Sequence, residues 1–260
     1  MTKIINDIAY DKAENLQVDI YEPEKSNSTN KLLLFWHGGG WFRGDKSSFK
    51  DLCSKIADHG FTVFAPNYSL APQHLFPAAH QDSINFVEWL LKTDFVNHKK
   101  VSITQIGASS GGTMALNIAG KYGFPTVTWS APVSYSAWMK DHQDVTPTID
   151  GRKELGLSDF HDINNAFYKY FTLAYAGAKD EAILKKMDAE SYDYTNLHQL
   201  LMINSADELS PTPYLLDFIN YLAQNNHAVD LKIISGTKHA MSYANQSLEC
   251  SLNYLLQAIK

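Results

Sequence analysis

The sequence has little cysteine and no recognisable metal motif. Only two cysteines, Cys53 and Cys250, occur in 260 residues. They are too far apart for a CxxC redox or zinc motif, and one possible pair is weak evidence for a secreted disulfide framework. The metal-binding pattern H-E-x-x-H is also missing. We therefore expect buried thiols rather than a disulfide scaffold, no metal, and no required cofactor.

Long hydrophobic runs and clusters of basic charge are missing as well. No run of 18 apolar residues occurs, and the segment up to Asp7 reaches charged and amide side chains too soon for a signal peptide. The chain carries 22 basic and 28 acidic side chains, a net charge of −6, with no basic cluster longer than the pair Lys99-Lys100. These features argue against a membrane span and against nucleic acid as a partner. We expect a cytoplasmic protein that is able to form a homo-oligomer.

What the sequence does contain is an alternation of apolar strands and amphipathic helices. A continuous apolar run such as 32–36, soon ended by glycines, is typical of a strand covered on both faces. Further strands are expected at 16–21, 61–65, 101–106, 126–129, 200–204 and 229–234, and helices at 47–59, 78–92, from 109 onward, and at 247–259. This pattern predicts an α/β fold with a mostly parallel sheet.

One long stretch interrupts the alternation. Between Ala131 and Gln199 no apolar run is long enough for a core strand, although 166–175 is rich in aromatic residues. A bare loop of this length does not fit a compact domain, so we expect 134–199 to form a small helical cap on a single domain spanning 1–260. Its aromatic side chains would either form a wall above the site or pack into a core of their own.

The pentapeptide Gly107-Ala-Ser109-Ser-Gly111 stands directly after a predicted strand and before a predicted helix. A G-x-S-x-G sequence in that position is typical of a nucleophilic serine on a sharp strand-to-helix turn, where neighbouring side chains must be small. A glycine-rich turn used only for helix–strand packing is the alternative. The sequence favours Ser109 as a nucleophile.

The segment His37-Gly-Gly-Gly40-Trp41 follows the first core strand. Consecutive glycines let backbone N–H groups turn toward the oxyanion of a tetrahedral intermediate. A phosphate-binding loop is the competing interpretation, but neither a Walker ending nor the spacing G-x-G-x-x-G is present. We expect an oxyanion hole here.

A serine nucleophile requires a base and an acid, which should follow it on loops at the carboxyl ends of later strands. The strand at 200–204 leads into Asp207 and Glu208, and the strand at 229–234 leads into His239. Because only one of two adjacent residues is expected to face the imidazole, we favour Asp207 over Glu208. His142 and His161, in the expected cap, would be solvated or line the substrate site.

These motifs, together with the segment 68–79, resemble esterases of the hormone-sensitive-lipase-like group of α/β hydrolases and the neighbouring small bacterial carboxylesterases. The resemblance implies that Ser109 is the nucleophile, His239 the base and Asp207 its orienting acid. It places the oxyanion hole at the N–H groups of Gly39, Gly40 and Ser110. Ser110 is itself a departure, because the family usually has alanine there.

By the same resemblance, His37, Trp41 and Tyr68 would contact the substrate. We expect a carboxylesterase that cleaves small esters with short acyl groups and needs no cofactor. Two alternatives stay open: an amidase of the arylformamidase type with the same triad, and a binding module without catalytic activity.

Overall fold

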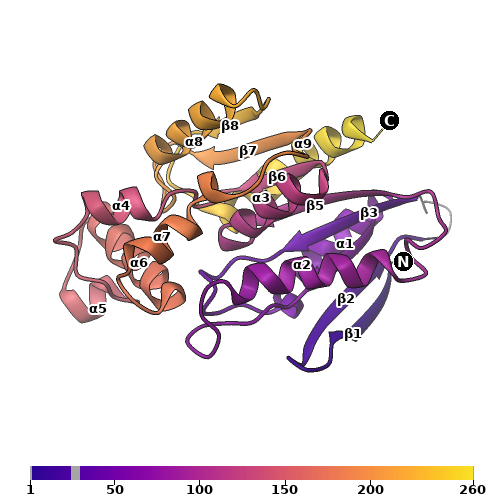
Figure 1. The fold of residues 1–260 in the computed structure, drawn as a ribbon, viewed down its shortest axis with the longest axis horizontal. Coiled ribbons are helices and arrows are strands. Elements are labelled where there is room, and N and C mark those ends of the chain that lie inside the picture. Colours follow the sequence, from indigo (N-terminus) through magenta and orange to yellow (C-terminus); the bar gives the residue numbers. More distant parts are fainter. Residues whose placement is uncertain (1, 25–29, 260) are drawn as a thin grey trace.

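The computed structural model describes residues 2–24 and 30–259, which form one eight-stranded sheet with helices on both faces (Figure 1). Six strands run parallel, and the first two are antiparallel to their neighbours. The order is β1-β2-β4-β3-β5-β6-β7-β8. The strands are β1 (Lys3–Asp11), β2 (Leu16–Glu22), β3 (Lys31–Trp36), β4 (Thr62–Pro66), β5 (Ser102–Ala108), β6 (Thr126–Trp129), β7 (Leu200–Ser205) and β8 (Asp230–Ile234). The predicted α/β fold with a mostly parallel sheet is confirmed.

Strand β3 shows why its sequence reads as an unbroken apolar run. Successive side chains of a strand point to opposite faces, and both faces of this strand are covered. Leu32, Leu34 and Trp36 pack into the core on one side, while Leu33 and Phe35 pack into the core on the other. All five side chains are buried.

Two helical layers cover the sheet. Helix α1 (Lys50–Asp58) and the C-terminal helix α9 (Ala244–Ala258) pack on one face, in the core that contains Leu33 and Phe35. Helices α2 (Ala78–Leu91) and α3 (Ser110–Tyr122) pack on the opposite face, and α8 (Thr212–Gln224) packs against a smaller cluster beside α3. A 3-10 turn at Lys46–Phe49 precedes α1, and another at Ala240–Tyr243 precedes α9. None of the helices in the described residues combines the length and apolarity that crossing a bilayer requires.

Between β6 and β7 the chain forms helices that lie together to one side of the sheet (Figure 1, pink to orange). They are α4 (Ser136–Asp141), α5 (Gly151–Leu155), α6 (Phe160–Ala176) and α7 (Glu181–Met187), followed by a 3-10 turn at Ala189–Ser191. The carboxylates of Asp159 and Asp180 accept hydrogen bonds from the first N–H groups of α6 and α7. An acidic N-cap satisfies otherwise unpaired donors and complements the helix dipole.

A buried histidine ties this helical segment to the sheet domain. His80 on α2 lies 2.9 Å from the Tyr175 hydroxyl through Nδ1 and 3.0 Å from the Tyr192 hydroxyl through Nε2. Tyr192 donates its proton to the carbonyl of Met187, so it accepts from Nε2–H, which leaves Nδ1 to accept from Tyr175. Burial lowers the pKa of His80 to about 3, so the ring is neutral.

Candidate active site

Ser109 lies on a strained turn between β5 and α3. Its backbone has φ 51° and ψ −124°, a conformation that residues with side chains rarely adopt. The turn fits under the end of β3 only because position 111 has no side chain: a Cβ on Gly111 would come within 2.2 Å of the Trp36 carbonyl oxygen. The Ser109 N–H donates to the carbonyl of Trp129 on the neighbouring strand. The turn thus presents the Ser109 hydroxyl at the carboxyl edge of the sheet.

His239 follows β8 and lies against Ser109. Its Nε2 is 2.9 Å from the Ser109 Oγ, and its Nδ1 is 2.5 Å from a carboxylate oxygen of Glu208. With Nδ1–H donated to the carboxylate, Nε2 carries the lone pair that can accept the serine proton. The structure therefore brings together a serine, an imidazole and a carboxylate in hydrogen-bonding series.

The carboxylate that contacts His239 belongs to Glu208. The expectation that Asp207 orients the imidazole is therefore wrong in this structure. The Asp207 N–H bonds to the carbonyl of Gly236, which continues the pairing beyond the ends of β7 and β8, and its side chain turns outward. That side chain is 52% exposed and lies 3.6 Å from His161 on α6, whereas the Glu208 side chain is fully buried. Which of two adjacent acids turns inward depends on this pairing, which the sequence alone does not reveal.

Glu208 has hydrogen-bond donors for both oxygens. One oxygen faces His239, and the other accepts from the N–H of Ser205 and from the hydroxyl of Ser130. Ser130 Oγ also accepts the N–H of Ala240, next to His239 in the chain. A buried carboxylate is tolerated when its lone pairs are satisfied in this way. Sequence reasoning missed Ser130, which holds both loops of the site together.

The glycine segment after β3 faces the Ser109 hydroxyl. Gly39 adopts φ 129°, and a Cβ there would lie 1.9 Å from the carbonyl oxygen of Arg43, so a side chain has no room. Within the described residues, the N–H groups of Gly39 and Ser110 make no hydrogen bond. The Gly40 N–H instead donates to the buried Ser110 hydroxyl at 3.0 Å. Of the three expected oxyanion donors, Gly40 is thus already engaged by the Ser110 side chain.

His37, Trp41 and Tyr68, expected to contact the substrate, lie behind this segment instead. All three are buried, and none is among the residues that line the pocket at Ser109. The Tyr68 hydroxyl donates to the His37 carbonyl, and the two rings stack with centroids 4.3 Å apart. Burial lowers the pKa of His37 to about 4, so its ring is neutral as well. The three side chains therefore lie outside the wall of the pocket, contrary to the expectation from the resemblance that they contact the substrate.

A pocket of about 380 Å³ opens at Ser109. Its walls come from the glycine segment, from the 3-10 turn after His239 and from helix α6, which contributes Phe167 and Phe171. Other aromatic residues of the 134–199 segment, including Trp138 and Tyr168, are buried in the core instead. The expected aromatic wall is therefore present in part, whereas the buried aromatics share the main core with the sheet rather than forming a separate core of the cap.

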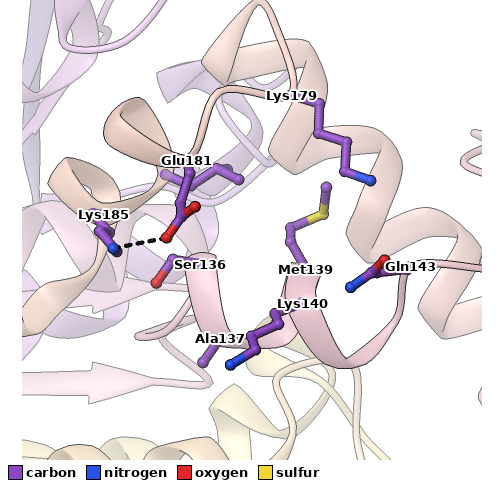
Figure 2. A pocket seen from close by; sticks show the side chains of 9 residues that line it. Ser136, Ala137, Met139, Lys140, Gln143, Lys179, Glu181 and Lys185 are labelled. Atoms are coloured by element: carbon purple, nitrogen blue, oxygen red, sulfur yellow. Dashed lines mark ion pairs between the residues drawn. The ribbon is translucent and has the colours of Figure 1, made fainter.

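A second, larger hollow of about 660 Å³ lies between α4 and α7 (Figure 2). Lys140, Lys179 and Lys185 line it, and Lys185 is paired with Glu181 at 2.7 Å. No histidine lines this hollow within the described part of the chain, so it lacks the base that activation of its Ser136 would require. Across residues 2–24 and 30–259, no three His, Cys, Asp or Glu side chains gather as metal ligands would. The chemistry of the described residues therefore points to the pocket at Ser109.

A family model described as the alpha/beta hydrolase fold matches residues 33–242. The chain belongs to the alpha/beta hydrolase family. Solved structures of this fold extend the likeness over nearly the whole chain. An esterase from Pyrobaculum calidifontis superposes with a TM-score of 0.74 at 18% identity, covering 99% of this chain and 86% of that one. Esterase B from Lactobacillus rhamnosis gives a TM-score of 0.71 at 15% identity, covering 99% and 87%.

Curated relatives are similar over a shorter segment. Carboxylesterase 20 of Arabidopsis thaliana is 32% identical over 106 residues, which are 38% of this chain and 32% of that protein. Ethyl acetate hydrolase of Pseudomonas putida is 33% identical over 108 residues, 40% and 34% of the two chains. The matched segments thus span about a third of the length of these relatives.

Proposed function

We propose that this α/β hydrolase is a carboxylesterase that works through an acyl-enzyme on Ser109. The observation that carries the proposal is the series formed by Ser109, His239 and Glu208, with contacts of 2.9 and 2.5 Å and a fully buried carboxylate. A serine hydroxyl becomes a nucleophile when an oriented imidazole accepts its proton. The similarity to carboxylesterases and to ethyl acetate hydrolase supports the same reaction class.

In this mechanism Ser109 Oγ attacks the ester carbonyl carbon while its proton moves to His239 Nε2. The imidazolium is stabilised by the Glu208 carboxylate, which remains ionised. The tetrahedral intermediate collapses as the C–O bond to the alcohol breaks and His239 returns the proton to the departing oxygen. Water, deprotonated by the same nitrogen, then attacks the acyl-enzyme and releases the carboxylic acid and Ser109.

The negative charge on the carbonyl oxygen would be held by the N–H groups of Gly39 and Ser110. Both donors lie beside the nucleophile and have no other acceptor within the described residues. Fixed donors of this kind stabilise charge that develops only in the transition state. Gly40 would help indirectly, because its bond to the Ser110 hydroxyl links the glycine segment to helix α3.

The pocket favours small esters with short acyl groups. At about 380 Å³ it is near the lower end of the range for small-molecule sites, and Phe167 and Phe171 close part of it. An amide with a small acyl group would also fit, and an arylformamidase is therefore the alternative within the same mechanism. A binding module without catalysis would not require the Ser109–His239–Glu208 series to be intact.

The test is a panel of p-nitrophenyl esters of increasing acyl length, run beside an N-formyl aryl amide. We expect a burst of p-nitrophenol with one equivalent per chain, a preference for acetyl and butanoyl over hexadecanoyl esters, and slower turnover of the amide. Ser109→Ala should remove the burst. Faster hydrolysis of the amide would favour the arylformamidase, and an unchanged burst in Ser109→Ala would refute the proposal.

The remaining expectations form part of the same proposal. Residues 134–199 would act as a cap, because α6 from this segment supplies two side chains of the pocket wall. The protein would work without a cofactor, on a small-molecule ester, as a cytoplasmic enzyme that is able to form a homo-oligomer. Light scattering at several concentrations and activity after treatment with a chelator address the oligomeric state and the cofactor.

A further inference from the structure

Arg43 stands in the wall of the pocket that contains Ser109. It is one of only two arginines in the sequence, the other being Arg152. Its N–H bonds to the carbonyl of Gly39, so the turn that orients the expected oxyanion donor also fixes the start of the Arg43 side chain. Among the described residues that line this pocket, Arg43 is the only lysine or arginine.

The guanidinium of Arg43 lies against two aromatic rings that contact each other, with ring centres 6.1 Å apart. Its central carbon is 5.1 Å from the ring centre of Phe42 and 5.1 Å from that of Phe167. Phe42 follows the glycine segment and Phe167 belongs to α6, so the two rings come from segments that are far apart in the sequence. Stacking uses the faces of a guanidinium and leaves its N–H donors free at the edges.

None of the described residues accepts a hydrogen bond from these donors. Within residues 2–24 and 30–259, Arg43 makes neither an ion pair nor a side-chain hydrogen bond. The nearest acid in the sequence, Asp45, is bonded to Ser47 and Asn67 instead. Glu208, inside the site, is fully buried and occupied by its own donors. Arg43 is exposed, so it presents a positive charge at the pocket whose donors are not taken up by the described residues and are open to solvent or a ligand.

The rest of the wall is mostly apolar. Phe49, Phe171, Leu209 and Met241 line the pocket, and the polar groups near them belong to the catalytic series and the glycine backbone. An apolar pocket with one oriented cation matches a ligand with a hydrocarbon body and an anionic end. A planar guanidinium fits a carboxylate in particular, through two parallel hydrogen bonds.

We propose that Arg43 is a specificity-determining residue that binds an anionic group of the substrate, so that the preferred esters carry a carboxylate on the acyl or the alcohol side. This inference rests on the carboxylesterase function proposed above. A carboxylate on the substrate would replace water at the edge of the guanidinium and place the ester carbonyl beside Ser109.

The test compares each anionic ester with a neutral ester of the same shape. Monoethyl adipate is paired with ethyl 6-methylheptanoate for a charge on the acyl side. 4-Acetoxybutyrate is paired with 4-methylpentyl acetate for a charge on the alcohol side. Values of kcat/KM are measured by acid release at low ionic strength for the wild type, Arg43→Met, Arg43→Lys and the matched control Arg152→Met, which removes the other arginine from the exposed surface of α5.

We expect the wild type to prefer one anionic ester over its neutral partner by about tenfold or more, and the pair that shows the preference identifies the charged side. Arg43→Met should abolish most of this ratio, mainly through KM, while its effect on the neutral ester stays within about threefold. Arg43→Lys should retain part of the preference for the anionic ester, since lysine keeps the positive charge but lacks the two parallel N–H donors of a guanidinium. Arg152→Met should match the wild type.

Three results would overturn the inference. One is equal use of anionic and neutral esters by the wild type, and another is an equal loss on both esters in Arg43→Met, which would show a purely structural role for the side chain. The third is the same change of ratio in Arg152→Met, which would indicate a general effect of net charge. Lack of hydrolysis of every ester by the wild type would instead refute the esterase function itself.

Discussion

The carboxylate of Glu208 lies 2.5 Å from Nδ1 of His239, and its side chain is fully buried. Its neighbour Asp207 is half-exposed and faces His161 on α6. Two acids adjacent in the sequence thus occupy different environments, one hydrogen-bonded to His239 inside the site and one at its rim. The difference allows their roles to be separated by substitution.

Glu208→Gln should lower kcat by about 10²-fold to 10⁴-fold, because an amide stabilises the imidazolium poorly and can reverse the orientation of the ring. Asp207→Asn should change kcat by less than about threefold, since its carboxylate contacts neither Ser109 nor His239. Both variants replace a carboxylate with an amide of similar shape. Steady-state kinetics on p-nitrophenyl acetate make the comparison, with circular dichroism to confirm folding. A larger loss for Asp207→Asn would reassign the acid.

Gly39→Ala should reduce kcat by about 10²-fold or more. Its φ of 129° and the 1.9 Å approach to the Arg43 carbonyl oblige the segment to move, which displaces an expected oxyanion donor. Gly156→Ala is the matched control, because Gly156 also has a positive φ but nothing lies within 4 Å of its Cβ position. If both alanine variants kept wild-type kcat, Gly39 would not be part of the oxyanion hole.

Stability should decline as the pH falls below about 6.5. His80 and His37 have folded-state pKa values lowered to about 3 and about 4 by burial, whereas the unfolded chain titrates near 6.5. The unfolded state therefore binds more protons in this window, so their stabilising contribution is complete above pH 6.5 and is lost toward pH 3. Each histidine adds a slope of at most about 1.4 kcal/mol per pH unit.

His80→Gln should remove the contribution of His80 to the pH dependence of the free energy of unfolding. Urea unfolding between pH 4.5 and 7.5 measures the free energy of unfolding for the wild type, for His80→Gln and for Gln81→Ala, an exposed neighbour on α2. The first variant should be less stable at pH 7.5 but show a flatter dependence on pH. The second should parallel the wild type. A slope in His80→Gln equal to that of the wild type would contradict the assignment.

Lys46→Met should destabilise the protein by about 3 kcal/mol or more. Lys46 lies 2.8 Å from Asp19 and 2.6 Å from Asp7, and the side chains of Lys46 and Asp19 are 6% and 5% exposed. Removing the lysine leaves the Asp19 carboxylate buried without its partner. Lys3→Met breaks the exposed pair with Glu22 and should cost no more than about 1 kcal/mol. Equal losses in urea unfolding would show that burial of the Lys46 pair is unimportant.

Much of the fold follows from local sequence patterns. The apolar run of β3 and the glycines around Ser109 are signals that act over a few residues, and they predicted the strand and the turn. Strand β1 (Lys3–Asp11) was missed because it is a half-buried edge strand with a register irregularity, so its side chains lack a regular apolar periodicity. Helix α8 was not assigned either, although Leu215, Phe218 and Leu222 give it a buried face.

The site was predictable in outline because its motifs stand directly after strands. What the sequence could not reveal depends on contacts between distant segments. The choice of Glu208 over Asp207 follows from pairing with Gly236, and the burial of Tyr68 and Trp41 follows from packing beneath the glycine segment. The contact of Arg43 with both Phe42 and Phe167 requires α6 to fold against the sheet domain, which no local pattern encodes.

In the proposed mechanism Ser109 forms a covalent intermediate. The most direct measurement is the intact mass of the chain after treatment with a fluorophosphonate, followed by peptide mapping. We predict a single adduct on Ser109, formed rapidly by the wild type, slowly by Glu208→Gln and not at all by Ser109→Ala. An adduct of the same mass and rate in Ser109→Ala, or none in a wild type that still hydrolyses esters, would contradict the account.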